Sequence, residues 1–317
     1  MHILDRRWPC WEISHNDQYI ATIGAGISIW DRATLEFVHH FTGIRWIHGG
    51  IFVNDDVLMV FTGEQKLFFF QISKKKLLWT VSRPRELAAS GDMCCCHIPG
   101  TEKVCCIAQG KKSLDEHFVL IVDWSSQKIL IHQILNCYRV VSNLVWSQEL
   151  GLSFLSHQAK GNNKTMLYRI IKVDDVGNAL ILYDEESDLS FLAYSGRYLF
   201  FADYNGQIPE AKAYPLEQPT IIDNLTLGEP LRIPITPLLT SSSVGTKRLV
   251  FPHVCCVDEC TGLLVVCNKQ KWVGVYDFIN GKAIMELQDG EVNCGKLLDT
   301  RLLIGYSSGF SVEPLKT

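Results

Sequence analysis

Short apolar runs alternate with polar turns along nearly the whole chain. Within these runs apolar and polar residues often alternate, and Asn, Asp and Gly stand between one run and the next. A period of two is the pattern of a half-buried β-strand, and turn residues between two such runs predict a hairpin. The pattern therefore predicts an all-β chain built from antiparallel hairpins.

One unit recurs along the chain. It consists of a short strand ending in an aromatic or apolar residue and Asp, a polar turn, and a second strand. The unit occurs at 27–41, 119–134 and 272–287, and at 66–79 with Gln71 in place of Asp. Another hairpin precedes each of these pairs, so the full unit has four antiparallel strands.

Seven such units can be counted from their third strands. These are centred near Trp30, Phe70, Val122, Tyr168, Ala213, Tyr276 and Val312. A four-stranded unit repeating at roughly 40–45 residues is typical of a β-propeller blade. One such sheet cannot bury both of its faces, whereas a ring of blades packs each face against a neighbour. The repeat predicts a seven-bladed β-propeller that spans 1–317 as a single domain.

The two ends of the chain predict how the ring closes. The last unit, from about Lys296, has three strands, and residues 1–7 form a spare strand before the first full unit. We expect this N-terminal strand to complete the seventh blade and close the ring, which removes an exposed sheet edge. A Pro- and Ser-rich irregular segment at about 208–252 interrupts the repeat. We interpret it as the outer strands of blade five with a surface loop.

These repeats resemble the WD40-repeat family. Trp30-Asp31 matches the signature dipeptide of that family, and Tyr276-Asp277 with Gly281-Lys282 matches its variant. The family's Gly-His dipeptide does not occur. The resemblance implies a rigid protein-interaction platform without catalysis, in which Trp30 and Asp31 are structural.

Composition and charge exclude several classes of protein. The chain has 30 basic and 34 acidic residues, a net charge of -4, and no apolar run near the roughly 18 residues of a membrane span. We expect no nucleic-acid binding and no membrane insertion. Twelve cysteines without a disulfide framework, and an N-terminus without a signal-peptide pattern, favour a cytoplasmic protein.

The cysteines raise the question of a metal site. His253, Cys255, Cys256, Cys260 and Cys267 supply enough soft ligands for zinc, but not at the usual C-x2-C spacing. The plainer interpretation is that the clustered cysteines are small apolar residues of buried strands. We expect no metal site and no cofactor.

Two motifs look catalytic. Gly305-Tyr-Ser307-Ser-Gly309 has the form of a nucleophile elbow, but no histidine follows it, so we interpret it as a hairpin turn. Gly110-Lys-Lys-Ser113 lacks the earlier glycine of a phosphate-binding loop. We therefore predict no catalytic residue.

Arginines stand beside aromatic residues in the connections that precede blades one to four. The neighbouring turns between second and third strands add Lys66, Lys111 and Lys112. Arginine offers a planar fork for carboxylate or phosphate, and both residue types are enriched at binding hot spots. We predict that this sector binds an acidic or phosphorylated peptide through Arg7, Trp8, Arg45, Trp46, Arg83, Arg85, Tyr138 and Arg139.

Three alternatives stay open. The charges can simply solvate loop tips, as in any protein. The chain can be a propeller enzyme, a hydrolase or lyase with its site at the central channel, or a small-anion-binding module. For a platform we expect a protein or peptide partner and a monomer outside that complex.

Overall fold

The computed structural model describes most of the chain. It covers residues 2–5, 8–89, 93–113, 116–134, 139–140, 144–160, 165–174, 178–187, 190–203, 210–217, 225–235, 238–241, 247–250, 253–268, 272–288 and 291–315. The described residues contain strands and turns but no helix, as the periodicity predicted.

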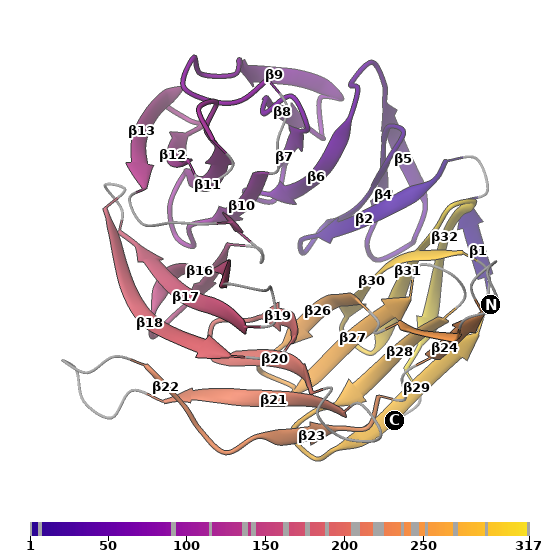
Figure 1. Cartoon of the computed structure of the whole chain (residues 1–317). Helices are drawn as coiled ribbons and strands as arrows, with labels where there is room; N and C mark the ends of the chain where they lie inside the picture. Colours follow the sequence, from indigo (N-terminus) through magenta and orange to yellow (C-terminus); the bar gives the residue numbers. More distant parts are fainter. Residues whose placement is uncertain are drawn as a thin grey trace. The chain divides into compact units, whose positions relative to one another are not determined.

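The first four sheets follow one another along the chain as antiparallel meanders (Figure 1). Blade one is β2 (Cys10–His15), β3 (Tyr19–Gly24), β4 (Ile27–Asp31) and β5 (Phe37–Phe41). Blade two is β6 (Ile47–Phe52), β7 (Val57–Thr62), β8 (Leu67–Gln71) and β9 (Lys76–Val81). Blade three is β10 (Met93–His97), β11 (Lys103–Gln109), β12 (His117–Asp123) and β13 (Lys128–Ile134). Blade four is β14 (Arg139–Val140) and β15 (Val145–Ser147), both paired with β16 (Gly151–Lys160), then β17 (Thr165–Val173) and β18 (Ala179–Ser187).

The remaining blades follow the same order. Blade five is β19 (Ser190–Tyr194), β20 (Tyr198–Asp203), β21 (Glu210–Glu217), β22 (Thr226–Leu227) and β23 (Leu231–Ile233). Blade six is β26 (His253–Asp258), β27 (Leu263–Asn268), β28 (Trp272–Asp277) and β29 (Lys282–Gln288). Blade seven is β30 (Val292–Leu298), β31 (Arg301–Tyr306), β32 (Gly309–Pro314) and β1 (His2–Asp5).

The fold is therefore the predicted seven-bladed β-propeller. The seven predicted third strands are β4, β8, β12, β17, β21, β28 and β32, each the third strand of its sheet. The N-terminal strand completes the last blade as expected, since β1 pairs antiparallel with β32 and places His2 opposite Val312.

The Pro- and Ser-rich segment forms the outer part of blade five and an extra hairpin. Strands β22 and β23 pair with opposite ends of β21, through Leu216 with Leu227 and Ala211 with Ile233. Beyond them, β24 (Leu238–Ser241) and β25 (Lys247–Val250) pair with each other as a two-stranded sheet.

The chain divides into two compact units. Unit 1 comprises Met1–Ile13, Leu189–Ile221 and Thr226–Thr317, and unit 2 comprises Ser14–Asp188 and Ile222–Leu225. Unit 1 holds blades five, six and seven, and unit 2 holds blades two, three and four with most of blade one.

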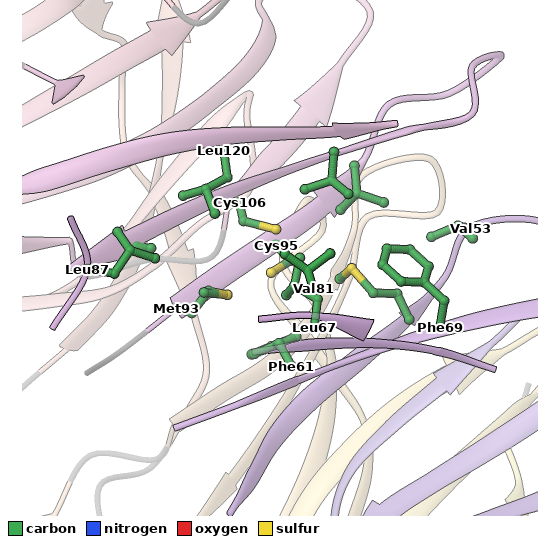
Figure 2. Close-up of a cluster of buried hydrophobic side chains, with 14 of the residues drawn as sticks. Val53, Phe61, Leu67, Phe69, Val81, Leu87, Met93, Cys95, Cys106 and Leu120 are labelled. Carbon is green, nitrogen blue, oxygen red and sulfur yellow. The ribbon is translucent and has the colours of Figure 1, made fainter. Parts of the chain in front are cut away.

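Most of the clustered cysteines are core residues, as the plainer interpretation predicted, namely Cys94, Cys95, Cys105, Cys106 and Cys267. Cys96, Cys255 and Cys256 are half-buried, so for them the prediction of a buried position was wrong. In unit 2, Cys95 lies opposite Cys106 and both face the cluster between blades two and three, beside Phe69 (Figure 2). Cys94 and Cys105 point to the other face of the sheet, into the cluster between blades three and four. Alternation along β10 and β11 thus shares these thiols between two cores.

A five-residue turn follows the third strand in four blades. Its fifth residue has positive φ: Leu35 (60°), Lys75 (52°), Gln127 (56°) and Gly281 (64°). In blade one, the Asp31 carboxylate accepts hydrogen bonds from the Thr34 backbone NH (2.8 Å), the Thr34 hydroxyl and the Ala33 NH. These bonds, that from the Thr34 backbone first, lower the pKa of Asp31. Asp31 is therefore a turn-capping residue, as expected.

Blade two supplies the same cap from another place. Its turn starts with Gln71, which cannot provide a carboxylate. Asp56, in the turn before β7, accepts hydrogen bonds from the Ser73 backbone NH (2.7 Å), the Ser73 hydroxyl (2.7 Å) and the Gln71 side chain (2.9 Å). The geometry of the turn is kept although the position of its acid has changed.

Candidate functional site

The predicted site residues fall into three groups. Arg7 and Tyr138 lie outside the described residues, and Arg139 is placed as part of β14, opposite His157. Trp8 is exposed and belongs to unit 1. Arg45, Trp46, Arg83 and Arg85 are exposed residues of unit 2, in the connections before blades two and three.

The backbone holds the connection before blade two against the turn between β7 and β8. The Gly63 NH donates a hydrogen bond to the Trp46 carbonyl at 2.8 Å. The His48 ring covers Gly63, and a Cβ there would lie 2.7 Å from His48 Nε2, so a larger residue would require the ring to move. This contact fixes Trp46 beside residues 63–66. We use the name blade-two rim for these residues together with Arg45 and Arg83.

Trp46 is both strained and exposed. Its φ is 54°, a left-handed conformation that is unfavourable for a bulky residue. The side chain is 68% exposed, the highest value among the large hydrophobic side chains that the structure describes. Neither property contributes to folding, and backbone strain of this kind gathers at functional sites.

Gln65 is the second strained residue of the rim. Its φ is 55°, its side chain is 1% exposed, and neither its amide oxygen nor its amide nitrogen has a hydrogen-bond partner in the described part of the chain. A buried amide without a partner costs about 1–3 kcal/mol. Two unfavourable residues, Trp46 and Gln65, thus flank one hydrogen bond between two segments.

Glu64 gives the rim its electrostatic character. Its carboxylate forms an ion pair with Lys66, and the hydrogen bond and charge of Lys66 lower the pKa of Glu64. The charges of Arg83 and Arg45 lower it further. The charges of three cations from three segments thus act on one partly exposed carboxylate, and two of these cations are predicted arginines.

The neighbouring cations of blade three are more fully engaged. Lys111 donates through Nζ to the Arg85 carbonyl at 2.9 Å. Arg83, which belongs to the blade-two rim, also donates to a carbonyl, that of Ala89, at 2.8 Å. Lys112 lies 3.7 Å from the buried carboxylate of Glu116, which also accepts the Lys112 backbone NH at 2.9 Å. Lys111, Lys112 and Arg83 thus already have partners within the fold.

Sequence reasoning missed both Glu64 and Gln65. It found the rim from its cations, whereas the acid and the amide lie in the short turn Thr62-Gly-Glu-Gln-Lys66. The available signal was Gln65 itself, because tight hairpin turns often need a residue with positive φ and a non-glycine residue at that position is strained.

A second group of polar residues lies on first strands of unit 1. Burial raises the pKa of Glu12, on β2, to about 7, although the positive charge of Lys296, on β30, opposes the shift. By its surface exposure the Glu12 side chain is half-buried. The sequence carried no signal for this pair because Glu12 and Lys296 are distant along the chain.

Four thiols lie near that pair. The Cys255 and Cys267 sulfurs are 3.1 Å apart, and the hydrogen bond with Cys267, then burial, raises the pKa of the Cys255 thiol. The hydrogen bond with Cys10, then burial, raises the pKa of Cys294. Thiols kept in the neutral form are poor nucleophiles and poor metal ligands.

The remaining motifs lie in structural positions. Among the described residues, no group of three or more His, Cys, Asp or Glu side chains has the geometry to hold a metal ion. Ser307 lies in the turn between β31 and β32, where its hydroxyl is 3.3 Å from the Asn293 amide nitrogen, so the elbow-like motif is a hairpin turn as predicted. The described residues contain no helix that is long and apolar enough to cross a membrane.

Comparison with known proteins supports the fold alone. The chain matches no protein-family model, and no curated protein matches it. It is similar to the crystal structure of the computationally designed Ika8 protein, with a TM-score of 0.58 and 12% sequence identity over 98% of this chain and 97% of the other. At this identity the likeness is one of backbone architecture, and the chemistry of the blade-two rim must be interpreted from its own residues.

Proposed function

We propose that the chain is a WD40-like interaction platform, cytoplasmic and without catalysis of its own. Its partner is a protein with an acidic or phosphorylated segment, which binds at the blade-two rim. The WD40-like character is supported by blade one, where the Trp30 indole NH donates to the Thr22 hydroxyl at 3.2 Å and Asp31 caps the turn.

The proposal depends on the coincidence of strain, exposure and charge at one place. Trp46 and Gln65 both have positive φ, and the hydrogen bond from Gly63 to Trp46 joins their segments. The Trp46 indole faces solvent beside Arg45. A purely solvating loop has no need of a strained, exposed tryptophan, whereas a binding surface gains from a rigid aromatic anchor.

The charges suit an anionic ligand. Arg45, Lys66 and Arg83 come from three segments and act on the same carboxylate, that of Glu64. A carboxylate or phosphate of the partner can share the same cations, because a guanidinium group can donate two parallel hydrogen bonds to either anion. The exposed face of Trp46 supplies the apolar area next to them.

The test uses labelled synthetic peptides in three matched forms, with glutamate, phosphoserine or serine at the central positions. We expect the two anionic forms to bind and the serine form to bind at least about tenfold more weakly. Arg45→Glu with Arg83→Glu should abolish anionic binding. Lys74→Glu with Lys75→Glu is the matched control, since it makes the same charge change at exposed positions in the turn at the other end of blade two. Equal binding by the double variant and the control would refute the proposal.

The alternative of an enzyme has one supporting group. Glu12 has a pKa raised toward neutrality, as a general acid or base requires. Its charged neighbour is Lys296, and the neighbouring Cys294 thiol is held neutral. We therefore do not extend the proposal to catalysis.

A further inference from the structure

The outermost strand of a propeller blade is an open sheet edge. Such an edge offers unpaired backbone NH and carbonyl groups to any extended chain, and proteins blunt it with bulges, short strands or charge. The seven outer strands of this chain can be compared one by one in the described residues.

Six of the seven outer strands are interrupted. A bulge breaks the pairing of β5 with β4 at Val38, of β9 with β8 at Leu78, of β18 with β17 at Leu182 and of β29 with β28 at Ile284. In blade seven the register of β1 shifts at Leu4, and in blade five the outer strand is split into β22 and β23. Each of these edges is a poor template for an added strand.

Strand β13 is the exception. It pairs with β12 without a shift from Asp123 opposite Lys128 to His117 opposite Ile134, seven consecutive residue pairs. Figure 1 shows it as the outer arrow of its sheet, with β12 on its inner side. Its regular register leaves a straight, continuous row of backbone groups on the outer side.

Two of the four exposed side chains of β13 are apolar, Ile129 and Leu130, and the other two are Lys128 and Gln133. Ile129 is 39% exposed and Leu130 is 44% exposed, and successive residues of a strand point to opposite faces. Ile131 packs against the core between blades two and three, and Ile134, on the other face, against the core between blades three and four. An added strand would therefore find apolar contacts on both faces at the Lys128 end.

We propose that β13 is a docking edge that takes an extended segment of a partner protein as a fifth strand of blade three. The charge of the edge specifies the segment. Lys128 is exposed at one end, and Ile129 and Leu130 follow without charge. The segment should carry an acidic residue opposite Lys128 and two apolar residues next to it.

A second copy of the chain fits this edge less well. In an antiparallel pair of β13 strands, each Lys128 would lie beside Ile134 of the other copy, and Ile134 is 3% exposed in the interior. The cation would gain no counter-charge and would face an apolar end. The acidic partner segment is therefore the occupant to which we commit.

The experiment measures binding of a labelled peptide, acetyl-Thr-Val-Thr-Val-Val-Glu amide, to the full chain by fluorescence anisotropy. We expect binding to fall at least about tenfold when the peptide is N-methylated at the alternate residues whose NH groups point toward β13. Binding should survive when the NH groups on the opposite edge of the peptide are methylated instead. Equal effects of the two methylation patterns, or none, would overturn strand addition.

Two variants of the chain complete the test. Insertion of one Gly between Ile129 and Leu130 gives β13 the bulge of the other blades and should abolish binding while the thermal transition is retained. Should the insertion fail to fold, Lys128→Glu still decides: it should reject the Glu-ended peptide and accept a Lys-ended twin. If Lys128→Glu still prefers the Glu-ended peptide, the proposal is overturned. It is also overturned if sedimentation shows a concentration-dependent dimer of the parent chain that the glycine insertion abolishes, because the edge would then bind a second copy. Arg45→Glu with Arg83→Glu should leave this binding intact, which separates it from the blade-two rim.

Discussion

The blade-two rim and the Glu12–Lys296 pair use the same kinds of residue to opposite effect. In the rim, Glu64 is partly exposed and its pKa is lowered by Lys66, Arg83 and Arg45, in that order. On the first strands of unit 1, burial raises the pKa of Glu12 to about 7 in spite of Lys296. One carboxylate stays charged at neutral pH, and the other is close to its point of protonation.

The difference separates recognition from stability. An exposed charge interacts through solvent, so its ion pairs contribute little to folding but remain available to a ligand. A buried carboxyl affects the free energy of unfolding each time it changes its protonation state. We therefore expect changes in the rim to alter binding, and changes at Glu12 to alter stability against pH.

The largest expected effect is that of Glu12→Gln. The folded protein holds the Glu12 proton more tightly than the unfolded chain, whose value is 4.5, so stability is greatest below pH 4.5 and falls as pH rises to about 7. Glutamine should remove this loss and raise the free energy of unfolding at pH 8 by at most about 3 kcal/mol.

The measurement is urea unfolding from pH 4.5 to pH 8. Glu64→Gln serves as the control, because its carboxylate is already charged over this window and should give no such gain. Parallel curves for the parent and Glu12→Gln would show that Glu12 is solvated like an ordinary surface acid.

The next effect concerns the buried amide of the rim. Gln65→Leu removes two unpaired polar atoms without a large change in volume and should raise the free energy of unfolding by about 1–2 kcal/mol. Gln18→Leu, at an exposed position, should change it by less than about 0.5 kcal/mol. A destabilised Gln65→Leu variant would indicate that the amide is satisfied in solution.

Trp46 should show a trade-off between stability and binding. Trp46→Gly relieves a positive φ at an exposed position and should stabilise the fold by about 0.5–1 kcal/mol while anionic peptide binding is lost. Trp146→Gly is the control, since Trp146 is also exposed but lies in β15, where glycine weakens a strand. Loss of stability in Trp46→Gly would mean that the tryptophan packs in the fold.

The fold was predictable because its determinants are local and repeated. Apolar alternation recurs in all blades, and an Asp at the end of the third strand with a polar turn after it recurs in three, so an uncertain assignment in one blade is supported by the others. Even so, the acid of blade two moved from position 71 to Asp56, which is visible only when the two turns lie side by side.

The site was predictable only in part because its determinants are few and come from separate segments. Arg45 and Arg83 were recognised as arginines in connections, but the group that they share, Glu64, is one glutamate among many. Glu12 and Lys296 approach each other only after folding. Strand β9 has a bulge and β13 does not, and this difference depends on the pairing register, which periodicity alone does not determine.

The smallest expected change in stability, and the most direct test of the rim, is Glu64→Gln. The solvated ion pair with Lys66 contributes little, so the free energy of unfolding should stay the same within the error of urea unfolding. Binding of the glutamate and phosphoserine peptides should strengthen severalfold, because the internal carboxylate no longer competes for Lys66, Arg83 and Arg45. Salt titration of both proteins gives the readout: the variant should show the steeper loss of peptide affinity with rising salt, since it presents a larger net positive charge. Weaker peptide binding by Glu64→Gln would instead show that Glu64 holds the three cations in the geometry that the ligand needs.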